Sequence, residues 1–403
     1  MTMPRPTMLV AATAAAFLSL GTLVVPSLAQ AQRVMIGGPG GGGGFDPGVD
    51  SRQLDRYSAF LDLSADQKDA AKALLEAYQI EFDQAASEAR KVLETTRQEF
   101  QETRDPSVFE EIGPKMEAFG KRRRELDRNF MSNLHDLLSE EQQQKWPALE
   151  RLRRRDTSMR AGFLSGEGVD IVRLVDDLKF EPDVKAQVAP ILEQYEMDVD
   201  RALQDRNALL EQQNFMRNFN FRQGITDEMR ERFEKIREQS IRVQEANRRA
   251  ARQIESVLPD GDRARFQSEF KERSFPRVYR SPYTMRAIES AARFDDLSSD
   301  QKKQIEELRA NYSRDAAPLN ERWASALEQQ EKAADPVDAV FGPGPGGGGN
   351  SEVRQARDAR RALDNKSLDS LKSILSTEQV ERLPDRREEA EAAGDQVFIQ
   401  RGR

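Results

Sequence analysis

The stretch Leu61–Phe82, LDLSADQKDAAKALLEAYQIEF, decides the fold because it occurs three times along the chain. It returns 117 residues later as 178–199, and again 117 residues after that, around 297–312. The copies align two sets of positions: Leu63 with Phe180 and Leu297, and Tyr78 with Tyr195 and Tyr312. A period of this kind is typical of one structural unit written several times. We therefore predict three similar units in tandem.

The motif Leu-Ser-x-x-Gln inside this stretch is a helix-start signal. In a capping box the serine hydroxyl accepts a hydrogen bond from the N–H three residues on, and the glutamine side chain accepts one from the serine N–H. The motif occurs four times: Leu63, Ser64 and Gln67; Leu138, Ser139 and Gln142; Leu297, Ser298 and Gln301; Leu375, Ser376 and Gln379. The second unit lacks it, because Glu181 and Val184 replace the serine and glutamine, but Pro182 stands where a first helical residue is favoured.

Apolar residues recur at steps of three and four, which predicts long amphipathic helices. The first runs from Ala65 to about Thr103, is broken at Asp105-Pro106, and is followed by a second helix up to Leu137. The same pattern predicts helices over 183–213 and 226–257, and over 298–332 and 352–374, with a kink at Pro318. Two long helices with a short break fold back on each other. The predicted fold class is all-α, with three tandem long antiparallel helical hairpins.

The predicted boundaries follow from this pattern. The three hairpins occupy 51–156, 168–273 and 285–387, and the basic segment 151–168 is interpreted as the connection between the first two. Two segments rich in glycine, a leader over 32–50 and a Gly/Pro loop over 341–350, are predicted to be disordered because they cannot pack a core. A charged tail covers 388–403.

The composition of the 403 residues fits this architecture. Apolar residues make up 37% and charged residues 33%, which suits long helices with a narrow apolar stripe better than one large core. The net charge of −8 argues against nucleic acid or an anionic membrane as the main partner. The absence of cysteine excludes disulfides and thiolate nucleophiles.

The N-terminus has the pattern of a secretory signal. Arg5 precedes an apolar run over 8–25, and Ala29-Gln30-Ala31 forms a small-residue cleavage site. We predict cleavage after Ala31, so that 1–31 is a signal peptide and the mature chain is periplasmic or secreted. The alternative is a retained membrane anchor. No later stretch reaches the ~18 apolar residues that a span requires, so no membrane span is expected after cleavage.

Paired L-[ST]-x-x-Q motifs, one before and one after a long helical hairpin behind a secretory signal, resemble the LTXXQ family, the Spy/CpxP group of bacterial periplasmic proteins. The resemblance covers about residues 54–387, as three copies where familiar members have one. It implies an envelope-stress or ATP-independent chaperone role, with unfolded or envelope proteins as partners. It also implies a homo-oligomer, or an internal pseudo-dimer made by the repeats. The alternative function is a structural spacer or adaptor of the cell envelope that binds no client.

The sequence offers little for catalysis, and we predict that the protein is not an enzyme. His135 is the only histidine, and neither a G-x-S-x-G motif nor a phosphate-binding glycine loop is present. We interpret His135 as a surface or boundary residue. No cofactor or metal is expected, because the histidines that bind metal in the resembling family are missing and no D-x-[DN]-x-[DN]-G loop occurs.

Two basic clusters, 121–124 and Arg151 with 153–155, are interpreted as solvated helix faces with ion pairs such as Arg122–Glu125 and Glu117–Lys121. The alternative is a site for an anionic ligand.

The most unusual segment is 214–221, NFMRNFNF, at the expected turn of the second hairpin. Its apolar residues are Phe215, Met216, Phe219 and Phe221. They form either a small cap over the hairpin end or an exposed surface that contacts clients or partners.

Overall fold

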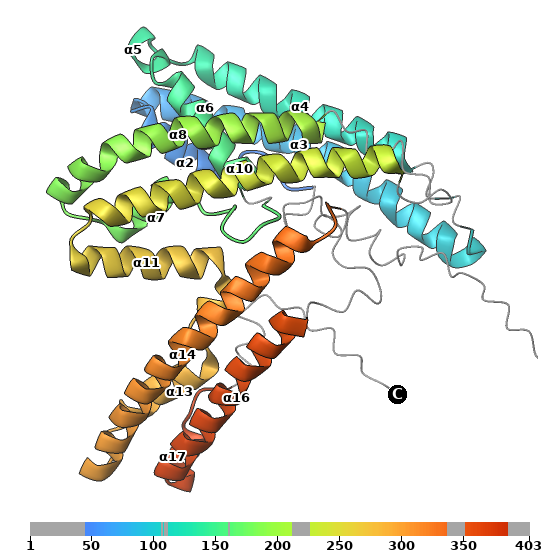
Figure 1. The fold of residues 1–403 in the computed structure, drawn as a ribbon. Helices are drawn as coiled ribbons and strands as arrows, with labels where there is room; N and C mark the ends of the chain where they lie inside the picture. Colours follow the sequence, from blue (N-terminus) through green and yellow to red (C-terminus); the bar gives the residue numbers. More distant parts are fainter. Residues whose placement is uncertain are drawn as a thin grey trace, which may run out of the picture.

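The chain is helical throughout the part that the structure describes. This computed structural model describes residues 45–105, 108, 112–159, 162–211, 226–336 and 351–385. Within these ranges there is no β-strand, so the predicted all-α class is confirmed (Figure 1). The predicted signal peptide, most of the Gly-rich leader, the Gly/Pro loop and the charged tail lie outside the described residues.

Six long helices associate two by two. α3 (Ala65–Thr103) packs along α4 (Ile112–Asp136), α8 (Pro182–Glu211) along α10 (Asp227–Val257), and α14 (Ser299–Ala333) along α16 (Ser351–Ile374). We call these the first, second and third helix pairs. The two helices of a pair run in opposite directions, because Gln67 at the start of α3 donates to the carbonyl of Leu137, just beyond the end of α4. The bounds of the six long helices agree with the predicted bounds to within a few residues, wherever the structure describes the helix end.

Local signals explain where the long helices begin and end. Ser64 and Gln67 form the expected capping box at the start of α3. The helix ends at Arg104, which has a left-handed backbone (φ 57°) just before Asp105-Pro106. Helix α14 begins with the capping box of Ser298 and continues through Pro318 to Ala333.

Short helices flank each pair, and sequence periodicity did not predict most of them. α2 (Ser51–Phe60), α7 (Ile171–Leu178) and α13 (Tyr283–Ala291) precede the pairs. α5 (Glu140–Gln143), α6 (Trp146–Ser158), α11 (Asp260–Ser274), α12 (Pro276–Tyr279) and α17 (Thr377–Glu381) follow them. Helices of this length are marginal alone and are stabilised by packing, which a periodicity over three or four turns does not report.

Each pair encloses its own apolar core. In the first pair, Leu75, Tyr78 and Phe82 of α3 pack in one cluster with Leu126 and Phe130 of α4. Separate clusters fill the second and third pairs. Burial of a large apolar side chain contributes about 1.5–3 kcal/mol, so these cores supply the main stabilising free energy of each pair.

The pairs are joined by the short helices. α6, which follows the first pair, packs on α8, and α12 packs on α14. In Figure 1 the third pair points away from the first two. Residues 151–158 belong to α6, so the segment 151–168 that the sequence analysis interprets as the connection is helical over that part. The helix persists there because its arginines find carboxylate partners on neighbouring helices, as described below.

Candidate functional site

The two Leu-Ser-x-x-Gln motifs of the first helix pair meet at one end of it. All four predicted capping boxes form. In addition, Gln67 Nε2 donates to Gln142 Oε1 at 2.8 Å, and Gln142 Nε2 donates to Gln67 Oε1 at 3.0 Å. We call this reciprocal contact the glutamine clasp. Each amide also donates across the pair, Gln67 to the carbonyl of Leu137 (2.7 Å) and Gln142 to that of Asp62 (3.1 Å).

The third pair has a similar clasp in which one of the two glutamine–glutamine hydrogen bonds is formed. Gln301 Nε2 donates to Gln379 Oε1 and to the carbonyl of Ile374, both at 2.9 Å. Gln379 donates to the carbonyl of Asp296 at 3.4 Å. An ion pair supports each clasp, Lys145 with Asp62 (2.5 Å) in the first pair and Arg382 with Asp296 (3.0 Å) in the third. The predicted motif residues therefore close the ends of helix pairs, and each glutamine caps two chain segments at once.

The second pair closes its end differently. Pro182 is the first residue of α8, as the sequence predicted. Where the other pairs use a glutamine, Arg265 of α11 donates to the carbonyl of Leu178 at 2.7 Å. An arginine thus reaches the turn before the helix from across the pair, which compensates for the missing motif.

The three aligned tyrosines occupy matching positions in the three cores. Each hydroxyl donates to a side chain of the returning helix: Tyr78 to Asp127 (2.6 Å), Tyr195 to Asn247 (2.9 Å) and Tyr312 to Asp364 (2.5 Å). Burial raises the pKa of all three phenols above its ordinary value, with the hydrogen bond to the carboxylate adding to this for Tyr78 and Tyr312. The sequence repeat therefore corresponds to a structural one.

The tyrosines differ in what they accept a hydrogen bond from. Tyr312 accepts from Arg360, a buried arginine of its own pair, at 2.7 Å. Tyr78 instead accepts from the backbone N–H of Gly48 at 2.7 Å, and Tyr195 from that of Ile171 at 3.4 Å. In the first two pairs the tyrosine therefore holds a chain segment that precedes the pair.

The segment over the first pair comprises residues 45–50, which we call the strap. Its Gly48 and Val49 are buried, and Phe45 is half-buried against Phe119 with ring centroids 5.3 Å apart. Arg90 lies over the Phe45 ring at 5.3 Å and donates to the Phe45 carbonyl at 3.4 Å. The strap ends at Asp50, the N-cap of α2. Residues 45–50 fall within the leader that the sequence predicted to be disordered, so for these six residues that prediction is wrong.

A related segment lies over the second pair. Gly-Val-Asp occurs at 48–50 and again at 168–170. Val169 is buried and Asp170 caps α7 in the same manner as Asp50 caps α2. Two side chains of the second pair anchor this second segment. Asn247 donates to the carbonyls of Gly166 (2.8 Å) and Glu167 (2.9 Å), and Arg206 pairs with the fully buried Glu167. The repeated tripeptide was the sequence signal that could have revealed both segments.

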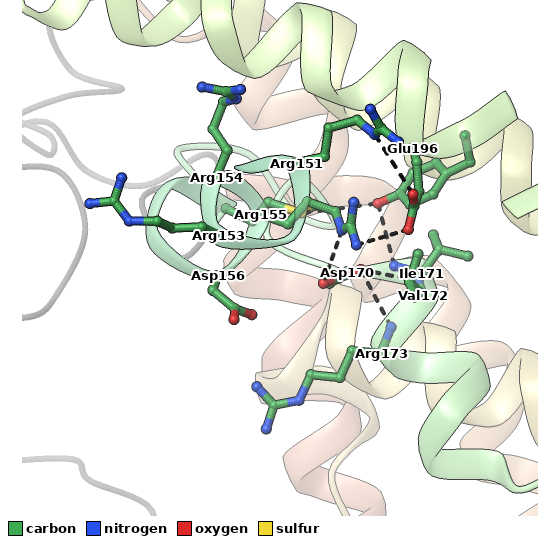
Figure 2. Close-up of polar contacts among 12 residues, drawn as sticks. Arg151, Arg153, Arg154, Arg155, Asp156, Asp170, Ile171, Val172, Arg173 and Glu196 are labelled. Atoms are coloured by element: carbon green, nitrogen blue, oxygen red, sulfur yellow. Dashed lines mark hydrogen bonds and ion pairs between the residues drawn. The ribbon is translucent and has the colours of Figure 1, made fainter. Parts of the chain in front are cut away.

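The arginines of α6 tie the first pair to the second (Figure 2). Arg155 is buried and reaches Glu196 (2.9 Å) and Asp170 (3.5 Å). Arg154 pairs with Asp200 at 2.7 Å. The interpretation of this cluster as a solvated face is wrong, because none of the four arginines is exposed and their carboxylate partners lie on packed neighbours.

Further contacts complete this junction. Arg56 of α2 pairs with Asp156 at 2.6 Å, yet burial outweighs the arginine and raises the pKa of Asp156.

The cluster at 121–124 behaves as predicted, since Lys121 pairs with Glu117 (2.8 Å) and Arg122 with Glu125 (3.0 Å).

The remaining candidates are placed as follows. The ring of His135 lies edge-on against that of Trp146, with centroids 4.7 Å apart. Phe215, Met216, Phe219 and Phe221 lie outside the described residues. Next to them in the chain, Met229, Phe233 and Ile236 of α10 form a small apolar cluster with Leu209, Leu210 and Phe163.

The described residues contain neither a side-chain cluster suited to a metal ion nor a helix suited to a membrane span. Across the described ranges, no three or more histidine, aspartate or glutamate side chains are arranged to hold a metal ion. In the same part of the chain, no helix combines the length and apolar character needed to cross a bilayer.

Comparisons with protein families, with curated proteins and with solved structures found no match for this chain. The geometry alone therefore identifies the candidate site. It is the face of the first helix pair under the strap, because the molecule already holds a non-helical segment there through ring and backbone contacts.

Proposed function

We propose that this protein is an exported, non-enzymatic binding protein that holds extended segments of unfolded or envelope proteins against its helix pairs. In this proposal the chain consists of three tandem antiparallel hairpins of the Spy/CpxP type, and the signal over 1–31 directs it to the periplasm. Its role is that of an envelope-stress protein or an ATP-independent chaperone. Charged residues, 33% of the chain, keep such complexes soluble.

The observation that supports this proposal most is the strap. A short non-helical segment lies across the first helix pair through one aromatic ring, one aliphatic side chain and the backbone. A face that holds one non-helical segment in this way is suited to hold a segment of another chain that presents the same groups. Two further apolar side chains are exposed on the long helices: Ile80 of α3 is 70% exposed, and Met197 of α8, at the equivalent position 117 residues later, is 54% exposed.

The test is suppression of aggregation. Reduced α-lactalbumin is allowed to aggregate with and without an equimolar amount of the mature chain, and light scattering is followed. We expect the scattering to be delayed and lowered by the wild-type chain, and less so by a variant in which Ile80 and Met197 are both replaced by Asp. A variant with Asp at two exposed polar positions, Gln144 and Asn311, serves as the control for added negative charge. An unchanged aggregation curve at equimolar protein refutes the chaperone role.

A second candidate function, a structural spacer or adaptor of the envelope, is favoured by the ion pairs between helix pairs. Besides the contacts of α6, Arg248 pairs with Glu328 at 2.8 Å and Ser165 donates its N–H to Glu331 at 3.0 Å, which connects the second pair to α14. Such contacts between helix pairs suit a protein whose helix pairs keep a fixed arrangement. This function predicts one constant partner in cross-linking experiments on cells and no effect on the α-lactalbumin curve.

A further inference from the structure

We infer that the face of the first helix pair under the strap is a binding site for peptides in which an aromatic residue stands three positions before a glycine, and that the strap is its built-in competitor. The inference rests on the proposed function and names the class of segment that the site takes. It is argued from the contacts of residues 45–50 and from the position of this segment in the chain.

The site has two recognition elements at a fixed spacing. Phe119 and Arg90 both contact the Phe45 ring: the Phe119 centroid and Arg90 Cζ each lie 5.3 Å from its centroid. Three residues further along, the Tyr78 hydroxyl accepts from the N–H of Gly48 at 2.7 Å. The phenol is held in place because it donates to Asp127 at 2.6 Å. The spacing between ring and glycine is therefore set by the two helices.

Glycine is required at the second element for steric reasons. A Cβ added to Gly48 would lie 2.5 Å from Asp127 Oδ2, which is far closer than such atoms approach. Asp127 cannot move away freely, since Tyr78 binds one of its oxygens and Arg153 lies 3.9 Å from the other. The residue after the glycine is aliphatic in the strap, and Val49 is completely buried in the core of the first pair.

The outer part of the strap is suited to leave first, because it is less buried than Gly48 and Val49. Asp46 is exposed and Phe45 and Pro47 are only half-buried. In the sequence, the strap is preceded by Gly37–Gly44, a run of glycine with one proline, which supplies no apolar side chain to pack. The related segment of the second pair, in contrast, lies between helices and is anchored by Asn247 and Arg206. Of these two segments the strap therefore has the fewer polar anchors, and its displacement removes Val49 from the core of the first pair.

The experiment uses a fluorescein-labelled peptide, GGFDPGVDS, which copies residues 43–51, and the full mature chain. Binding is followed by fluorescence anisotropy. A tethered segment competes at an effective concentration in the millimolar range, so the wild-type chain is expected to bind the peptide weakly. Phe45→Ala in the chain weakens the strap and is expected to tighten peptide binding about tenfold, because the variant loses the ring contacts with Phe119 and Arg90.

Two further peptides test the recognition elements. GGFDPAVDS carries alanine in place of the glycine and GGADPGVDS lacks the ring, and both are expected to bind the Phe45→Ala chain at least about tenfold more weakly than the parent peptide. Equal binding of the glycine and alanine peptides overturns the inference, because the clash with Asp127 would then not exist. Equal affinity of the wild-type and Phe45→Ala chains for the parent peptide also overturns it, because the strap would then not compete.

Release of the strap is measured separately. Since the chain has no cysteine, one cysteine at exposed Asp46 accepts an environment-sensitive dye, and a cysteine at exposed Asp66 on α3 serves as the matched control. Addition of the parent peptide is expected to change the signal at position 46 and not at 66. A concentration-dependent dimer of the wild-type chain that Phe45→Ala abolishes would overturn the inference, since the site would then take the strap of a second copy.

Failure of this inference is distinguishable from failure of the proposed function. The peptide experiment contains no aggregating client. A chain that binds the peptide as described but leaves the α-lactalbumin curve unchanged retains the site and loses the chaperone role. A chain that suppresses aggregation but ignores the peptide retains the chaperone role and loses this site.

Discussion

Disruption of the glutamine clasp of the first helix pair is expected to lower the free energy of unfolding by about 2–3 kcal/mol. In the variant Gln67→Ala, four hydrogen bonds are lost. The amide oxygen no longer accepts from Ser64 N (2.9 Å) and Gln142 Nε2 (3.0 Å), and the amide nitrogen no longer donates to Gln142 Oε1 (2.8 Å) and to the Leu137 carbonyl (2.7 Å). Each neutral bond contributes about 0.5–1.5 kcal/mol, and the lower half of the range applies because this end of the pair is partly exposed to water.

The clasp makes a sharper prediction for the pair of substitutions. Gln142→Ala removes the same kinds of bond, and two of them are the ones already shared with Gln67. The double variant is therefore expected to lose about 1 kcal/mol less than the two single variants combined. A Gln67→Glu variant separates cap from clasp, since a carboxylate still accepts from Ser64 N but has no N–H to donate. It is expected to fall between Gln67→Ala and the wild type.

The assay is urea unfolding with one fluorescent reporter. The chain has two tryptophans, and Trp146 packs against the core of the first pair. In a Trp323→Phe background, tryptophan emission therefore follows the first pair alone. Gln144→Ala, at an exposed position on the same turn, is the matched control and is expected to stay within about 0.5 kcal/mol of the parent. If the effects of Gln67→Ala and Gln142→Ala add to within about 0.3 kcal/mol, the two amides do not interact and the clasp is refuted.

Three further predictions concern the junction and the N-terminus. Arg155→Met leaves Glu196 and Asp170 without their buried cation and is expected to lower the free energy of unfolding by about 3 kcal/mol or more. Small-angle scattering is expected to show a larger radius of gyration, because α6 leaves α8. An unchanged radius and an unchanged stability would contradict this prediction. Because burial raises the pKa of Asp156, the folded state binds this proton more readily than the unfolded state, so wild-type stability gains from this group as pH falls toward the folded pKa. The melting temperature of Asp156→Asn relative to wild type is therefore expected to fall as the pH is lowered from neutral, and the opposite trend would refute the assignment. Chain recovered from the producing cells is expected to begin at Gln32, which N-terminal sequencing checks; a chain that retains Arg5 would point to the anchor alternative.

Much of the local structure could be predicted from the sequence because its causes are local. A capping box needs only residues three apart, so Ser64 with Gln67 and its three relatives marked helix starts that the structure reproduces. Steps of three and four between apolar residues likewise predicted the long helices. The 117-residue repeat predicted that Tyr78, Tyr195 and Tyr312 are equivalent, and each binds a polar side chain of the returning helix.

Only the tertiary structure decided what these residues do for one another, because their partners are far apart in the chain. Gln67 and Gln142 are 75 residues apart, and neither motif alone shows that its glutamine binds the other. Arg155 reads as a solvated charge in the sequence and becomes a buried tie once α8 supplies Glu196. Residues 45–50 have too few apolar side chains to order themselves, and they are held in place only because two helices bring Phe119 and Tyr78 to the right spacing. Periodicity and capping act over a few residues and are visible in the sequence, whereas contacts between helices depend on a geometry that exists only after the chain has folded.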